Sequence, residues 1–525
     1  MTLTRAQLRD AILLARCTVA GVEIRAAERY VEPPSSTGPL PHPGGLDTTI
    51  RVALSRPYTA PSTSSVEAVV PVPAGLPAAV ARGSMPAGSL EVALWAPGMQ
   101  WEQRHILWRG RVRSLAVDGA TVTVGAELGV DDEAQLCQDG VVDATTWPDA
   151  DPRQSVGRAY PLVLGRPGRM ETPAQAVPGS PCPVVDRAAN LLPDRVLLAG
   201  HLVEATSVTL YGAERDGTIY TATGTPSTLA DGAGRTVTVV SVAGAPATFR
   251  GDFGVGDPLV PPPMVYAAWV GDGGASDPDG TSWARMGGAL RYVALRSALP
   301  IEQGAVYTAA AEIEHYEIGA YVDDPAVTPW GWLTSVLGAI VPIGWMPGDG
   351  WRPGVWSLTP PSTREPLSVG TGVERQGDVT SADLADIVSD LTLRYALDAR
   401  SGDYQRSVRV RALPSGVDVV GDIAADPATL AYGSRRATAE TEIVYERRTA
   451  AALATLMLGW RSVPWRTVRL RAGREYGWLR PGTWVEVTDA SVSLDAAPGI
   501  LEAVTWAPGA TLVLDVLLPS GPLYS

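Results

Sequence analysis

The sequence predicts a mainly β protein with several domains, built from small β-barrels or sandwiches and a few short packed helices. Its length of 525 residues is enough for two to four domains at about 150 residues each. Its 55 glycines and 45 prolines make up about a fifth of the chain, which is too many breaks for long helices. Short runs of alternating apolar and polar residues lie between these breaks, and this alternation is typical of half-buried strands.

Changes in composition and in apolar pattern along the chain divide it into four predicted regions. Loops rich in proline and glycine separate the regions, and the third contains several tryptophans among glycines and prolines. The regions are an N-terminal β-rich domain (1–155), a middle β-rich domain (156–327), a helix with a Trp-rich connector (328–389) and a C-terminal β-barrel domain with one packed helix (390–525).

Helices are expected only where the sequence carries start signals. Thr4 and Gln7 form a capping box at the start of the first helix. Thr328 as N-cap and Pro329 at the first helical position begin the second, and Thr449 is expected to cap the last. The predicted helices cover about residues 5–15, 328–341, 381–388 and 449–460.

Strands are expected throughout the rest of the chain. Asp118-Gly119 between two alternating runs predicts a hairpin, because this dipeptide suits a tight turn. The predicted strands are 22–24, 48–54, 106–113, 121–126, 160–165, 196–198, 207–211, 219–223, 236–242, 290–296, 306–316, 391–397, 408–410, 467–471, 484–488, 500–505 and 511–517.

The composition excludes several classes of protein. The chain contains no lysine, so all 42 basic residues are arginines. P-loop nucleotide hydrolases, pyridoxal-phosphate enzymes, protein kinases and Ser-x-x-Lys hydrolases all need a lysine. A net charge of −14 argues against a protein that coats nucleic acid. No basic segment followed by an apolar run opens the chain, so no secretory signal is expected.

We expect no catalytic, cofactor-binding or metal-binding residues. The chain has neither a His-Glu-x-x-His nor a Gly-x-Ser-x-Gly motif, although a triad formed only in space stays open. The three cysteines show no zinc or disulfide spacing. The side chains in question are Cys17, Cys137, Cys182, His42, His105, His201 and His315, all far apart in the sequence.

Two acidic clusters are the nearest approach to a site. The first cluster, at 312–317, is expected on one strand. It could form a paired-carboxylate or metal site, but a solvated strand face is the favoured interpretation. The second cluster, at 272–280, resembles part of a calcium-binding loop but lacks the Glu that ends such a loop, and a plain turn is the favoured interpretation. The clusters are Glu312, Glu314, His315 and Glu317, and Asp272, Asp277 and Asp279 with Gly280.

The uncharged run from Trp330 to Met346 raises two further possibilities. Its 17 residues are short for a membrane span and Pro342 interrupts them, so a buried helix with a loop is favoured. The tryptophans at 330–356 could stack against a carbohydrate, although packing in a core explains them better.

The C-terminal part carries a series of segments in a characteristic order. They are Tyr432-Gly433, an acidic strand at 441–445, the helix from Thr449-Ala450 to Leu458, Ser462-Val463-Pro464, a strand of alternating charge at 466–471, the turn Leu479-Arg-Pro-Gly482, and 485–488. This series resembles the hub proteins at the tail tip of tailed bacteriophages, with Thr483 where that family usually has Asp. Residues 108–110 with the 118–119 hairpin, and 160–165, are similar in texture to the N-terminal halves of such tail proteins.

The resemblance implies a non-enzymatic structural role in the virion, at the tail tip or baseplate, for a protein made in the host cytoplasm. Family hubs are trimers whose β-barrels form a ring that continues the tail tube. The implied partners are further copies of the chain, the distal tail, tube and tape-measure proteins, and tip or fibre proteins, without nucleic acid, membrane span or cofactor. A receptor- or carbohydrate-binding tail module and, less favoured, a tail-associated cell-wall hydrolase stay open as alternatives.

One strand of the resembling segment suggests how a ring could form. Arg466, Arg469 and Arg471 are expected to point outward, between the apolar positions Val468 and Leu470. Arginine can make bidentate contacts with carboxylates of a neighbouring subunit, which would fix the register of a ring. A solvated strand face is an equally good interpretation, because surface charges contribute little to stability.

Overall fold

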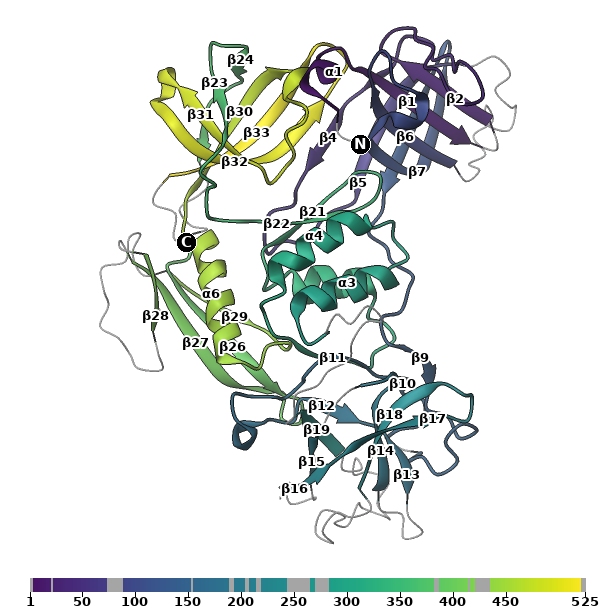
Figure 1. Cartoon of the computed structure of the whole chain (residues 1–525), viewed down its shortest axis with the longest axis vertical. Helices are drawn as coiled ribbons and strands as arrows, with labels where there is room; N and C mark the ends of the chain where they lie inside the picture. The colour runs from purple at the N-terminus through teal and green to yellow at the C-terminus, as the bar shows by residue number, and fades with distance from the viewer. Residues whose placement is uncertain are drawn as a thin grey trace.

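The computed structural model describes residues 3–19, 22–72, 88–152, 154–187, 193–203, 207–213, 219–242, 265–269, 283–381, 387–413, 416–420 and 435–520. Strands account for 46% of the structure and helices for 15%, which confirms the predicted mainly β class. The molecule is elongated, with two curled sheets at one end, helices and a third sheet in the middle, and a sandwich at the other end (Figure 1).

The first curled sheet is antiparallel and is built from N-terminal residues. Its order is β2 (Val22–Ala27), β1 (Ile12–Val19), β6 (Gly88–Trp95), β7 (His105–Asp118), β8 (Thr121–Leu128), β5 (Ser64–Pro71) and β3 (Asp47–Thr48). The predicted hairpin is confirmed: Asp118 pairs with Thr121, and Gly119 takes a left-handed φ of 56° in the turn between them.

The first predicted helix is shorter than expected. The capping box of Thr4 and Gln7 is present, but α1 covers only Arg5–Arg9. The residues from Ile12 onward form β1 instead. The first four of them are buried, and Arg16 is partly exposed. A strand buried on both faces reads as a continuous apolar run, which a helical pattern can mimic over a few residues.

The second curled sheet combines both ends of the chain. Its order is β23 (Glu365–Ser368), β31 (Trp484–Asp489), β32 (Leu494–Trp506), β33 (Thr511–Pro519), β30 (Trp465–Gly473) and β24 (Val373–Arg375), with β25 (Thr380–Ser381) on β30 and β4 (Ile50–Ala53) on β32. The predicted strands in 467–517 are confirmed. Strand β4 comes from the first predicted region, and Ile50 pairs with Trp506 in the last.

The middle of the molecule corrects two predictions. The expected strands 290–296 and 306–316 are the helices α3 (Met286–Arg296) and α4 (Gln303–Ile313), which pack against each other. The buried residues of α4, which are Val306, Ala309, Ala310 and Ile313, recur every three to four positions. This period is helical, whereas the alternation that was expected has a period of two.

A Trp-rich segment follows these helices. The helix predicted over 328–341 is present as α5 (Pro329–Gly331), which continues into the π-helix η3 (Trp332–Leu337). The Thr328 hydroxyl accepts a hydrogen bond from the Gly331 N–H, which confirms its capping role. The chain then forms a hairpin of β21 (Ile343–Met346) and β22 (Arg352–Val355).

A third sheet lies beside the helices, with α6 (Arg447–Arg461) on one face. Its order is β28 (Gly416–Val420), β27 (Asp403–Leu413), β26 (Asp390–Asp398) and β29 (Arg436–Glu440), and the predicted pair 391–397 with 408–410 is confirmed. The N-cap of α6 is Glu446 and not Thr449, whose hydroxyl donates to the Glu446 carboxylate over 2.6 Å. Most of the helix expected at 381–388 lies outside the described residues.

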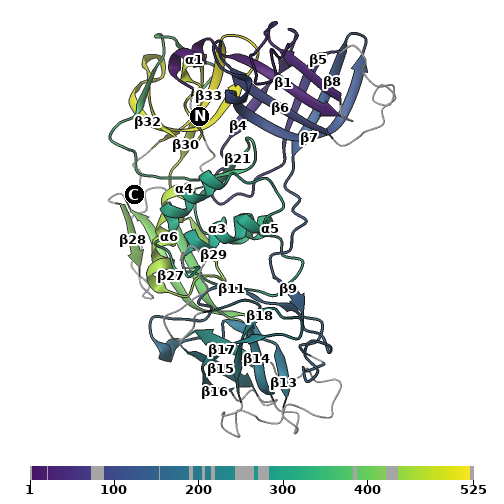
Figure 2. The same cartoon turned by 45° about the vertical axis from the view of Figure 1, so that its right-hand side comes forward.

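The far end is a sandwich of two four-stranded sheets (Figure 2). One has the order β12 (Ser180–Cys182), β19 (Val265–Trp269), β15 (Val208–Ala213) and β16 (Ile219–Gly224). The other has β13 (Val184–Arg187), β14 (Pro193–Ala199), β18 (Thr236–Ser241) and β17 (Pro226–Ala230). Two short pairs lead to it: β9 (Gln138–Val141) with β10 (Ala159–Tyr160), and β11 (Leu162–Gly165) with β20 (Gly319–Val322). The strands predicted in 160–242 are thereby confirmed.

Four single turns of 3-10 helix complete the described elements: η1 (Trp101–Gln103), η2 (Pro173–Gln175), η5 (Arg474–Tyr476) and η6 (Ala490–Val492). One apolar core extends from the curled sheets through the helices into the sandwich. A second, small core packs Trp147 and Tyr160 against residues of one sheet of the sandwich, among them Val185, Leu197 and Val239. The modules therefore share buried side chains.

Candidate functional site

The first acidic cluster does not form a site. Glu312 lies on α4, Glu314 ends that helix, and Glu317 lies beyond it against Arg285, 3.4 Å away, so the expected strand is wrong. Burial raises the pKa of the Glu312 and Glu314 carboxyls. Among the residues that the structure describes, no three His, Cys, Asp or Glu side chains are placed to hold a metal ion. The second cluster, at 272–280, lies outside the described residues.

The three cysteines and His42 lie in the core and do not form a common site. All three cysteines are buried and free, and burial raises the pKa of Cys17 and Cys182 to about 12, so these thiols are neutral. Burial also lowers the pKa of His201 to about 4. Neutral, enclosed thiols are poor nucleophiles. Their burial fits a packing role.

The tryptophans of the connector pack against one another inside the molecule. The Trp330 ring centroid lies 4.6 Å from that of Trp345 and 5.1 Å from that of Trp351. The Trp356 ring contacts that of Trp460 at 5.1 Å, which joins the connector to α6. All five tryptophans of the connector, including Trp332, are at most 4% exposed, so they offer no face on which a sugar could stack. None of the helices in the described part of the chain is long and apolar enough to cross a membrane.

Two of the three predicted arginines of β30 point outward, whereas Arg466 is partly buried and shares the strand face of Val468 and Leu470. Val468 and Leu470 are buried, whereas Arg469 and Arg471 are exposed. Arg469 is nevertheless held by its own sheet, because its Nε donates to Asp515 Oδ1 over 2.8 Å, and this hydrogen bond raises the pKa of the guanidinium. Arg471 has only a weaker contact, from its Nε to Thr511 Oγ1 at 3.2 Å. Arg471 is thus the freer of the two for contact with another molecule.

The segment that resembles tail hubs forms one continuous path through two modules. Helix α6 ends at Ser462, whose N–H donates to the Leu458 carbonyl over 2.7 Å, and β30 begins three residues later. The turn before β31 contains Gly482 with φ of 89°, a left-handed conformation that favours glycine. The Tyr432-Gly433 part of the resemblance lies outside the described residues.

A buried arginine connects the two curled sheets and was not found by sequence reasoning. Arg474 is 3% exposed, and its Nη1 donates to the Ala11 carbonyl over 2.6 Å and to Glu28 Oε2 over 3.0 Å. Its Nη2 contacts the same carboxylate and donates to the Ala507 carbonyl over 3.0 Å. No local signal marks this residue, because its carboxylate partner is 446 positions away in the chain.

The comparisons with known proteins give structural neighbours only, since no protein-family model and no curated protein matches the sequence. The 43 kDa tail protein of prophage MuSo2 from Shewanella oneidensis aligns with 96% of this chain and 98% of its own, at 9% identity and a TM-score of 0.32. A chain of the phage P2 virion baseplate in its activated conformation covers the same shares, at 10% identity and a TM-score of 0.22.

A chain of a native gene transfer agent particle aligns with 51% of this chain and 84% of its own, at 13% identity and a TM-score of 0.18. These TM-scores are too low to establish a common fold.

Proposed function

We propose that this chain is a non-enzymatic structural component of the tail tip or baseplate of a tailed bacteriophage. In this role it acts as a hub, a ring that joins the tail tube to distal tip or fibre proteins. The sequence resemblance of residues 432–488 supports the proposal. The observation that carries it furthest is the joint construction of the two curled sheets, in which β4 completes the C-terminal sheet and Arg474 binds Glu28.

This construction suits a ring because the two sheets of each subunit must keep a fixed orientation if the ring is to stay closed. The two curled sheets lie side by side at one end of the molecule in both views (Figures 1 and 2). Backbone pairing between β4 and β32 and the buried ion pair hold them as one block. A block that bears outward arginines on β30 can present a fixed charged edge to a neighbouring copy.

The expected partners follow from that role. We propose a homo-oligomer, a trimer as in the family that the sequence resembles, with distal tail, tube and tape-measure proteins on one side and tip or fibre proteins on the other. The chain would be made in the host cytoplasm and act in the virion. The acidic balance of −14 gives no support to nucleic-acid binding. The buried tryptophans likewise give none to the carbohydrate-binding alternative.

Two experiments test this proposal. A tag at one end of the chain, detected by gold labelling in electron microscopy of particles, is expected at the tail tip. Labelling elsewhere in the particle, or none, would refute the assignment.

The second experiment tests the ring. We expect Arg471→Glu to lower the fraction of ring-sized oligomer in size-exclusion chromatography with light scattering, while the melting temperature stays that of the parent. Arg469 is unsuitable for this test because its substitution also removes a hydrogen bond to Asp515 within the sheet. The matched control is Arg406→Glu, an exposed arginine on β27 of the third sheet. Equal ring formation by both variants would show that β30 is not an interface.

A further inference from the structure

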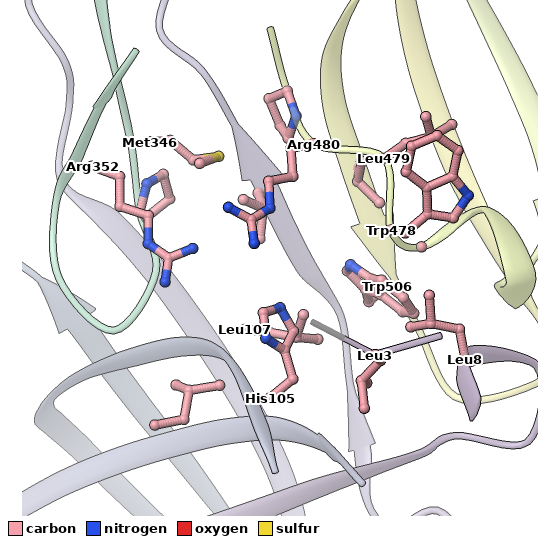
Figure 3. A pocket seen from close by; sticks show the side chains of 16 residues that line it. Leu3, Leu8, His105, Leu107, Met346, Arg352, Trp478, Leu479, Arg480 and Trp506 are labelled. Carbon is pink, nitrogen blue, oxygen red and sulfur yellow. The ribbon is translucent and has the colours of Figure 1, made fainter. Parts of the chain in front are cut away.

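A cavity opens where α1, β4, β7, the β21–β22 hairpin and the loop before β31 meet (Figure 3). Its position joins three parts of the chain that are distant in sequence. The walls are mostly apolar, with side chains from each of these parts. They include Leu8 of α1, Leu107 of β7, Met346 of β21 and Trp506 of β32.

The polar side chains of this cavity are all basic. Arg352, Arg480 and His105 line it, and in Figure 3 their nitrogen-bearing ends lie near one another. No Asp or Glu is among its lining residues, although acidic residues outnumber basic ones in the whole chain by 56 to 42. Burial, with the nearby charges of Arg352 and Arg480, lowers the pKa of His105 to about 4, so the imidazole is neutral at pH 7.

The two guanidinium groups differ in what they already bind. Arg352 forms an ion pair with Glu302, which lies outside the cavity lining. Within the described part of the chain, the Arg480 guanidinium makes no hydrogen bond or ion pair. One positive charge is therefore left without a counterion on an exposed side chain that lines an apolar wall, where an anion from the solvent can reach it.

We propose that this cavity binds a carboxylate attached to an apolar body. The planar guanidinium of Arg480 matches a carboxylate bidentately, and neutral His105 can add a third hydrogen bond. A single negative charge fits better than a phosphate dianion, because the Arg352 charge is already balanced by Glu302. Leu107, Met346 and Trp506 cover the apolar part. This inference is independent of the proposed role in a tail.

The carboxylate can come from a free organic acid or from an acidic residue next to apolar residues in a partner protein. Isothermal titration of the full-length chain distinguishes these sources with two probes. One is sodium octanoate, with 1-octanol as its neutral match. The other is a blocked tripeptide with Glu between two leucines, with Gln in place of Glu as its match. Binding of octanoate indicates a free acid, and binding of the peptide alone indicates a protein partner.

Variants test the role of the arginine. Arg480→Gln is expected to weaken binding of the carboxylate probe by about tenfold or more, as loss of a charge-assisted hydrogen bond predicts. Arg406→Gln, an exposed arginine on β27, is expected to leave binding unchanged. Because Arg480 is exposed, both variants should keep the parent melting temperature. Absence of binding by both carboxylate probes, equal binding of the neutral matches, or unchanged binding by Arg480→Gln would each overturn the proposal.

Discussion

Replacement of the buried Arg474 tests whether the two curled sheets form one block. In Arg474→Leu, the apolar side chain fills much of the space but leaves the Glu28 carboxylate and the carbonyls of Ala11 and Ala507 without their donor. Removal of one partner from a buried ion pair costs about 3–5 kcal/mol, because the other charge stays buried without compensation. Glu28 keeps 15% of its side chain exposed, so we expect the lower part of that range.

The cost can be read as a change in melting temperature. A loss of about 3 kcal/mol lowers the melting temperature of a 150–250-residue unit by about 6–12 °C. Because the chain has several modules and need not unfold in one step, the transition of the curled sheets is followed by hydrogen exchange of β1 and β33 amides during heating. The double variant with Glu28→Gln should recover part of the loss, since it removes the stranded charge.

Arg471→Leu is the matched control, because Arg471 is an exposed arginine on β30, three residues before Arg474. Surface changes of this kind stay within about 0.5 kcal/mol. If Arg474→Leu melts like Arg471→Leu, and β1 exchanges no faster than in the parent, the arginine does not hold the sheets together. The pairing of β4 with β32 would then be the contact that joins the two sheets.

Three further predictions concern other parts of the molecule. Burial opposes ionisation of the Asp390 carboxyl, but the hydrogen bond from Arg409 and the charges of nearby arginines outweigh burial and lower its pKa. The ionised carboxylate therefore stabilises the folded protein above the unfolded pKa of about 3.9, and this stabilisation is lost as the pH falls through the native pKa. The melting temperature of Asp390→Asn should accordingly lie below the parent at pH 7, and the gap should narrow between about pH 5 and pH 2. Tyr160→Phe leaves the buried Trp147 indole N–H without its acceptor at 2.8 Å and should cost about 1–3 kcal/mol in urea unfolding, with an unaltered midpoint as the contrary result. Trp345→Ala should lower stability by about 3–5 kcal/mol and leave glycan-array signals at background, whereas a glycan signal from the parent that this variant loses would restore the carbohydrate alternative.

The sequence determined the fold class and most strands because these depend on local patterns. Proline and glycine breaks, the Asp118-Gly119 turn and the alternation around Val468 each act within a few residues. The capping signals at Thr4 and Thr328 were also correct for the same reason. In 290–296 and 306–316 the apolar residues fit the period of a strand and that of a helix equally well, and the local pattern led to the wrong prediction of strands. These segments are the helices α3 and α4, which pack against each other.

Only the tertiary structure decided which residues meet. Ile50 pairs with Trp506, Arg474 binds Glu28, and Arg352 lies near Arg480 in one cavity, although each pair is separated by more than a hundred positions. No period or motif in the chain encodes such contacts, because they follow from the packing of complete sheets against each other. The acidic cluster at 312–317 failed as a site for the same physical reason: a helix and its end direct neighbouring carboxylates apart, whereas the expected strand would have aligned them.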